Sequence, residues 1–191
     1  MSNTTNPSLR THPDLANLLR DAEARNLTDE ELDYYRSIVP EYETRANAAS
    51  EIQEVGTAIS GKIAKQVTTA YRYDEFHDLS TKKCFRDISL TVKYATLAML
   101  MGDPNWLRDK MLVWFKTILQ SFRFPDIKPG DSGLNNDQAH IQKLEDIQPF
   151  QRSIFETYTL LDQKMKEALT PESYQEIAPY LNQAIDILSN D

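Results

Sequence analysis

The sequence predicts an all-α protein that folds as a single domain over residues 1–191. Apolar residues recur at spacings of three and four, the period of an amphipathic helix, and no sustained apolar–polar alternation marks a strand. Five Gly and nine Pro are too few for a collagen-like or linker-like chain. With 40% hydrophobic and 26% charged residues, the composition is typical of a globular protein with one core.

Caps and prolines mark the first helices. We expect a loose arm over residues 1–12, which are polar and contain proline, and a first helix over about residues 14–25. Thr28 and Glu31 have the spacing of a capping box, in which each side chain bonds the backbone N–H of the other, so a second helix should start there. Pro40 lacks a backbone donor and should kink or break this second helix.

The central helices follow the same period. Residues 46–69 should form a helix that contains Gly56 and Gly61, which indicate close approach of another helix unless they are simply tolerated. An aromatic and acidic loop over residues 71–79 is then expected before a strong helix over residues 80–101.

The second half of the chain should add four helices, over residues 104–122, 137–146, 149–169 and 171–188. The inner side of the first of these is expected to consist of Leu107, Met111, Trp114, Phe115 and Ile118. Residues 124–136 contain two Pro and two Gly and are predicted to form a long loop, and Pro179 should bend the last helix.

Charge and cysteine count exclude several classes of partner. A net charge of -8 argues against a nucleic-acid backbone or an anionic membrane as the main partner. One cysteine allows no internal disulfide, and because the first residues hold no apolar stretch, we expect no secretion signal there. The most apolar run, residues 94–101, is far too short to span a bilayer. We therefore expect a protein of the reducing cytoplasm without an integral membrane segment.

The charge is also unevenly distributed. Residues 21–54 hold ten acids and three bases, whereas residues 82–128 hold nine bases and four acids. The two segments are expected either to attract each other, within one molecule or between copies, or to form two solvated surfaces that never meet.

Cys84 is the residue most suited to chemistry. Asp87 follows one helical turn later, so the thiol and the carboxylate should share one helix face and hold one ligand between them. Lys82, Lys83, Arg86 and the helix dipole should favour the thiolate and make the sulfur reactive. The alternative is that Cys84 is a small buried hydrophobe and that Asp87 pairs with a neighbouring base.

Other chemistries have less support. Of the three histidines, only His77 lies near Cys84 in sequence, and no third group is evident to orient a Cys–His pair, which disfavours an enzyme. The expected helix over residues 104–122 contains no His for an axial haem ligand. One Cys and three scattered His also give no zinc spacing.

Residues 83–88 (Lys-Cys-Phe-Arg-Asp-Ile) carry a family resemblance. This segment resembles the bilin-attachment helix of phycobiliproteins, the light-harvesting subunits of the phycobilisome, whose pattern is Lys-Cys-x-Arg-Asp-Ile. Residues 27–32 look like the start of that family's N-terminal helical pair, and residues 180–189 are similar to its C-terminal Tyr-x-x-x-Ala-Ile-x-x-Leu-Ser ending. The resemblance runs in the right order from about residue 25 to residue 190.

The resemblance implies a globin-like helical bundle with two extra N-terminal helices that help to pair subunits. It also implies a cofactor, a linear tetrapyrrole (bilin) such as phycocyanobilin. By resemblance, Cys84 forms a thioether to ring A, Asp87 accepts hydrogen bonds from the central pyrrole N–H groups, and Arg86 and Lys83 pair with the propionates.

The sequence also departs from the family. Residues 148–151 read Gln-Pro-Phe-Gln, where the family usually carries Pro-x-Trp-Tyr against the pigment. The spacing from Cys84 to Pro149 is longer than usual, and the excess falls in an insertion over about residues 124–147, which should cover or fill the pocket. Residues 90–93 replace the usual Tyr-Tyr-Leu-Arg.

Two functions follow from these agreements and departures. The first is a divergent bilin-binding phycobiliprotein of the light-harvesting system, pigmented through Cys84. The alternative is a pigment-free globin-like relative that acts by protein contacts in bilin biosynthesis, pigment handover or phycobilisome assembly. Either is expected to be non-enzymatic and to form homo- or hetero-oligomers with phycobilisome subunits or bilin-pathway proteins, in the cytoplasm or peripherally at the thylakoid surface.

Overall fold

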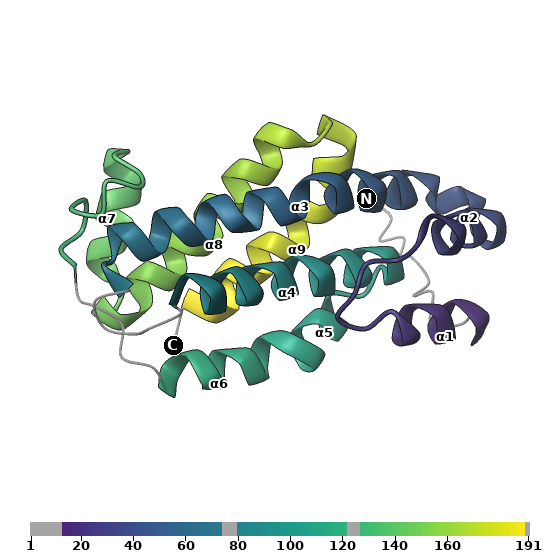
Figure 1. Cartoon of the computed structure of the whole chain (residues 1–191), viewed down its shortest axis with the longest axis horizontal. Helices are drawn as coiled ribbons and strands as arrows, with labels where there is room; N and C mark the ends of the chain where they lie inside the picture. Colours follow the sequence, from purple (N-terminus) through teal and green to yellow (C-terminus); the bar gives the residue numbers. More distant parts are fainter. Residues whose placement is uncertain (1–12, 74–79, 122–126, 190–191) are drawn as a thin grey trace, which may run out of the picture.

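The computed structural model describes residues 13–73, 80–121 and 127–189, which form a helical bundle (Figure 1). Every regular element within these ranges is a helix, which confirms the predicted all-α class. The predicted arm over residues 1–12 lies outside the described residues. The helices are α1 (Pro13–Asp21), α2 (Asp29–Ile38), α3 (Glu43–Ala70), α4 (Ser80–Met101), α5 (Pro104–Leu107), α6 (Val113–Ser121), α7 (Gln138–Asp146), α8 (Pro149–Ala168) and α9 (Pro171–Ser189).

The predicted signals at the start of the chain are present. Thr28 Oγ1 accepts a hydrogen bond from the Glu31 backbone N–H at 3.2 Å, and Glu31 Oε2 accepts one from the Thr28 N–H at 2.8 Å. The capping box is therefore confirmed. α2 ends at Ile38, and Pro40 opens a 3₁₀ turn that leads into α3, so the predicted break is confirmed as well.

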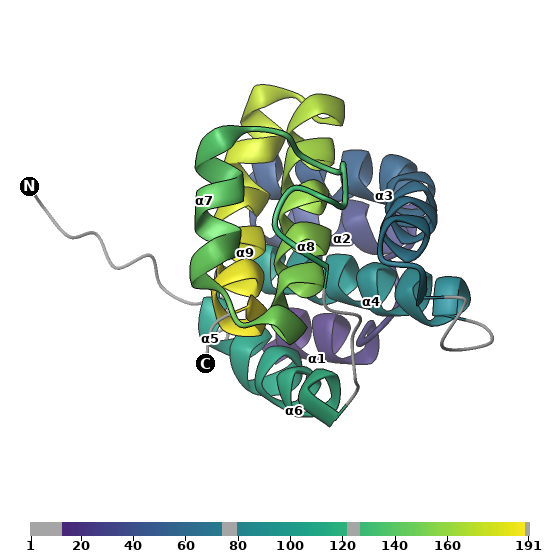
Figure 2. The ribbon, with the colours of Figure 1, turned by 90° about the vertical axis from the view of Figure 1, so that its left-hand side faces the viewer.

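The core lies where α3 and α4 run antiparallel and pack against α8 and α9 (Figures 1 and 2). Gly56 on α3 lies where α4 comes close, because a Cβ atom at this position would be 3.4 Å from Val92 Cγ1. The close approach predicted from glycine is thus present at Gly56. The apolar side chains of these helices form one buried cluster that fixes the position of α4.

One predicted core position, that of Trp114, is wrong. Trp114 was expected to face inward, but its exposed fraction is 57%, and that of the neighbouring Val113 is 54%. Residues 108–112 form a π-helical turn, whose extra residue rotates the following helix relative to a continuous α-helix. The inward positions consequently become Phe115 and Leu119.

The segment of residues 127–147 follows α6 in the sequence and lies against α8 (Figure 2). It contains a turn and the short helix α7, whose N-cap Asp137 accepts a hydrogen bond from the His140 N–H at 3.1 Å. α9 continues as one α-helix through Pro179. Among the helices that the structure describes, none has the length and apolar character required to cross a bilayer.

Candidate functional site

Helix α4 changes character along its length. Between residues 91 and 101 every side chain except Lys93 is buried. Between residues 80 and 90, only Ser80 and Ile88 are buried, and the remaining side chains are half-buried or exposed. The helix therefore belongs to the core at its C-terminal end and presents polar groups at its N-terminal end.

One stripe of α4 carries the predicted site. Ser80, Cys84, Asp87 and Thr91 are spaced by four, three and four residues, so they lie along one face of the helix. Ser80 Oγ donates a hydrogen bond to the backbone carbonyl of Tyr73, just beyond the end of α3, at 3.3 Å. The stripe thus starts against the end of α3. We call these four residues the α4 stripe.

The Cys84 thiol is not activated as the sequence suggested. Its side chain is half-buried, and burial, with a further contribution from the Asp87 charge, raises the pKa of Cys84 to about 12. The predicted thiolate is therefore wrong for this structure. Loss of water around the sulfur outweighs the basic neighbours, because Lys82 and Arg86 point into solvent.

Asp87 forms a hydrogen-bonded ion pair with its sequence neighbour Arg86. Burial raises the pKa of Asp87, and the Arg86 hydrogen bond and the charges of Arg86 and Lys83 oppose this rise. Arg86 Nε donates to Asp87 Oδ1 at 2.7 Å, although the Arg86 side chain is 67% exposed. The structure thus brings Cys84, Asp87 and Arg86 together. The half-buried Lys83 acts on the carboxylate through its charge.

Two phenols that sequence reasoning missed border the α4 stripe. The Tyr158 hydroxyl on α8 lies 3.1 Å from Thr91 Oγ1, which also donates to the Asp87 backbone carbonyl at 2.9 Å. Burial raises the pKa of Tyr158, and the pKa responds to the charges of Asp87 and Cys84. Burial likewise raises the pKa of Tyr73, and the charge of Cys84 adds to this rise. Only the fold brings these tyrosines to Cys84, so no sequence spacing could have revealed them.

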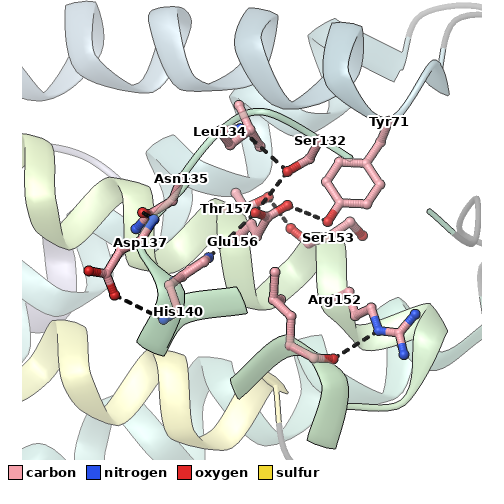
Figure 3. Close-up of polar contacts among 11 residues, drawn as sticks. Tyr71, Ser132, Leu134, Asn135, Asp137, His140, Arg152, Ser153, Glu156 and Thr157 are labelled. Atoms are coloured by element: carbon pink, nitrogen blue, oxygen red, sulfur yellow. Dashed lines mark hydrogen bonds and ion pairs between the residues drawn. The ribbon is translucent and has the colours of Figure 1, made fainter. Parts of the chain in front are cut away.

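A buried carboxylate joins three elements beside this site (Figure 3). Glu156 on α8 is 2% exposed and accepts hydrogen bonds from the Tyr71 hydroxyl and, at 2.9 Å, from Ser132 Oγ. His140 Nε2 on α7 lies 3.4 Å from the same carboxylate, in a geometry that falls short of a hydrogen bond. Burial, reinforced by Glu156, raises the pKa of Tyr71, so its hydroxyl stays protonated and donates. We call Tyr71, Ser132, His140 and Glu156 the Glu156 latch.

Further contacts hold the segment of residues 127–147 on α8. Arg152 donates to the backbone carbonyl of Leu144 at 2.9 Å and to that of Ile127 at 3.5 Å, so one guanidinium bonds both ends of the segment. The His140 ring stacks on Phe155 with centroids 5.4 Å apart. The segment that was predicted to cover or fill the pocket is therefore fixed to α8.

The α4 stripe and the Glu156 latch meet at the end of α3. The rings of Tyr71 and Tyr73 are in contact, with centroids 5.9 Å apart. Tyr71 bonds Glu156, whereas the Tyr73 carbonyl bonds Ser80. A chain of contacts thus links Ser132 through Glu156 to the Tyr71–Tyr73 pair, and this pair to the first turn of α4.

Other features of the described chain lie away from this site. A hollow of about 190 Å³ between α1 and the turn after α5 is lined by Ala16, Leu19, Arg20, Glu23, Met101, Trp106 and Lys110. Within the described ranges, no group of three or more His, Cys, Asp and Glu side chains is arranged to hold a metal ion. The α4 stripe is therefore the candidate site.

Comparison with known proteins agrees with this fold. The family model described as phycobilisome protein matches residues 18–128, which include α2, α3 and α4. No curated protein matches the chain. The fold is of the all-α, globin-like phycobiliprotein class. The chain belongs to the phycobilisome protein family, so the family membership predicted from the motif around Cys84 is confirmed.

Proposed function

We propose that the protein is a divergent bilin carrier of the light-harvesting system, with a linear tetrapyrrole attached through Cys84. The observation that carries the proposal is the α4 stripe, in which Cys84 and Asp87 lie one turn apart on one helix face. Asp87 is only partly exposed and accepts a charge-assisted hydrogen bond. Pyrrole N–H groups would take the place of the Arg86 guanidinium on this carboxylate, which would free Arg86 and Lys83 for the propionates.

The attachment needs no oxidant and no leaving group. Cys84 would hold the pigment by addition of its S–H across a carbon–carbon double bond on ring A, in which the sulfur–carbon bond would replace the double bond's second bond and the thiol proton would go to the adjacent carbon. The attacking species is the thiolate. Because the pKa of Cys84 is raised to about 12, the reaction requires a step that exposes the thiol or a lyase that removes its proton.

Coexpression with phycocyanobilin and bilin lyases tests the proposal. A denaturing gel of the purified protein should show a band with zinc-enhanced fluorescence, since a covalent pigment survives denaturation. The Cys84→Ala variant should lose this band while it keeps the helical circular dichroism of the wild type. A colourless wild-type protein with every lyase tried would contradict the proposal.

A second candidate function rests on the burial of the thiol. The same raised pKa, together with Tyr73 and Tyr158 beside the α4 stripe, favours a pigment-free relative that acts by protein contacts in bilin biosynthesis, pigment handover or phycobilisome assembly. Affinity capture from cyanobacterial extract should then recover a bilin reductase, a lyase or an antenna subunit. An unrelated acidic protein of similar size serves as the control. Equal recovery of these partners by that control would contradict this candidate.

We also propose that oppositely charged surfaces guide assembly into oligomers, at the thylakoid surface or in the cytoplasm. Asp29, Glu30 and Asp33 are exposed on α2, whereas Lys82 and Lys110 are exposed on the central helices. Attraction between such surfaces is screened by salt. Size exclusion should therefore give a larger species at low salt than at high salt, and elution as a monomer at both would contradict the proposal.

A further inference from the structure

We propose that the segment of residues 127–147 controls access to the Cys84 thiol through the Glu156 latch. The latch holds the end of α3 against α8, and the end of α3 is bonded to the first turn of α4. When the latch is closed, Cys84 is half-buried; when it opens, the thiol becomes more accessible. The relevance of this control to pigment attachment rests on the proposed function.

The first step of the argument is the buried carboxylate. Glu156 is nearly inaccessible to water, and a buried carboxylate is stable only when hydrogen bonds replace its lost hydration. Those bonds come from Tyr71, directly after α3, and from Ser132 in the segment of residues 127–147. Removing Ser132 would leave Glu156 short of a donor, so both the segment and the end of α3 depend on the same group (Figure 3).

The second step leads from Tyr71 to the thiol. Tyr71 contacts Tyr73, the Tyr73 carbonyl accepts the Ser80 hydroxyl, and Ser80 and Cys84 occupy successive turns of the same helix face. Thr68 Oγ1 and Thr81 Oγ1, 2.9 Å apart, provide a second link between the end of α3 and the start of α4. Tyr73 also lies close enough to Cys84 for the thiol to affect the Tyr73 pKa, so loosening of the end of α3 would uncover Cys84.

The third step concerns which part of the molecule can open. Local opening occurs where few bonds hold a segment and leaves the rest of the fold intact. The segment of residues 127–147 is held by the polar and aromatic contacts of Arg152, Phe155 and Glu156, and it also buries Leu144 and Ile147. The second half of α4 is packed in the core except at Lys93. Opening at the latch thus exposes Cys84 without unfolding the bundle.

The chain offers a matched pair of variants for a test. Ser132 Oγ donates to Glu156 at 2.9 Å, and Ser173 Oγ donates to Glu51 at 2.8 Å. Ser132→Ala and Ser173→Ala therefore each delete one hydroxyl–carboxylate hydrogen bond of nearly equal length. Ser173 is on α9 and its partner Glu51 is on α3, well before the end of that helix. Ser173→Ala is the control for a general loss of stability.

The readout is the rate at which a small maleimide modifies the native protein. Cys84 is the only cysteine of the chain, so the rate reports this thiol alone. Ser132→Ala should raise the rate about tenfold, the change that corresponds to about 1.4 kcal/mol in an opening equilibrium. Tyr71→Phe, which removes the bond to Glu156 from the other side, should raise it similarly. Ser173→Ala should leave it unchanged.

Two outcomes would overturn the proposal. One is a wild-type rate in both Ser132→Ala and Tyr71→Phe, with circular dichroism showing that both variants are folded. The other is an equal increase in Ser173→Ala, which would indicate general loosening. No pigment takes part in this experiment, so its failure would leave the proposed bilin attachment untouched, and a colourless protein would leave the latch untouched.

Discussion

The two halves of helix α4 serve different purposes, although they belong to one continuous helix of 22 residues. The C-terminal half is almost entirely buried, whereas the N-terminal half carries Cys84, Asp87 and Arg86 at the border between core and solvent. The buried half fixes the helix, and this fixes how deeply the side chains of the border half are buried. Packing of the buried half thus sets the positions of Cys84 and Asp87, whereas their partial exposure to water sets their pKa values.

The largest expected effect concerns the Cys84 proton. With a pKa raised to about 12, about one per cent or less of the thiol should be ionised at pH 9, whereas an ordinary cysteine with a pKa of about 8.5 would be mostly thiolate. The ultraviolet absorbance of the wild type minus that of Cys84→Ser measures the thiolate directly. A clear titration between pH 7 and pH 9 would show that the border half is more open than we describe.

The next prediction compares the same substitution in both halves of α4. Leu97 is 1% exposed in the buried half, and Leu90 is half-buried in the other. Leu97→Ala should cost about 3 kcal/mol of unfolding free energy, because it leaves a cavity in the core. Leu90→Ala should cost about 1 kcal/mol, since its site is partly solvated. Urea denaturation checks both values, and equal losses would remove the distinction.

A smaller effect is expected at the boundary between the halves. Thr91 bonds both its own helix and Tyr158, whereas the buried Thr96 hydroxyl bonds the Val92 carbonyl of its own helix. Thr91→Val should therefore destabilise the protein by about 1 kcal/mol more than Thr96→Val, because it leaves a buried phenol without this partner. Identical urea midpoints for the two variants would mean that the Tyr158 contact contributes nothing to stability.

The smallest expected effect is that of Arg86. Because this side chain is largely exposed, Arg86→Gln should change the unfolding free energy by less than about 0.5 kcal/mol. The same substitution should raise the pKa of Asp87 further, since Arg86 is the main group that opposes the effect of burial. Carboxyl carbon chemical shifts measured against pH follow this change. A lowered pKa of Asp87 would contradict the assigned pairing.

Local signals in the sequence were sufficient for most of the fold. Thr28 and Pro40 act through the residues next to them, so their effects could be predicted without tertiary structure. The exposure of Trp114 could not be predicted, because the π-helical turn that precedes it changes the helix phase. No residue pattern indicated that turn. The face shared by Cys84 and Asp87 followed from helical spacing alone.

The remainder of the site depends on distant parts of the chain. The pKa of Cys84 is dominated by burial, which spacing along one helix does not reveal. Tyr158 and Glu156 come from α8, and Ser132 comes from the segment that the sequence identified as a long loop and an insertion, without indicating this contact. The charges of Lys82, Lys83 and Arg86 were visible in the sequence, but the loss of water that outweighs them was not.

The most direct test of a thioether at Cys84 is the mass of one peptide. Cleavage after Lys83 and Arg86 releases residues 84–86 of the protein coexpressed with phycocyanobilin and lyases. We predict that this peptide carries the mass of one pigment and that Cys84→Ser yields no pigmented peptide. An unmodified residue 84–86 peptide from the folded wild-type protein, or a pigment found on another peptide, would contradict the proposed bilin carrier.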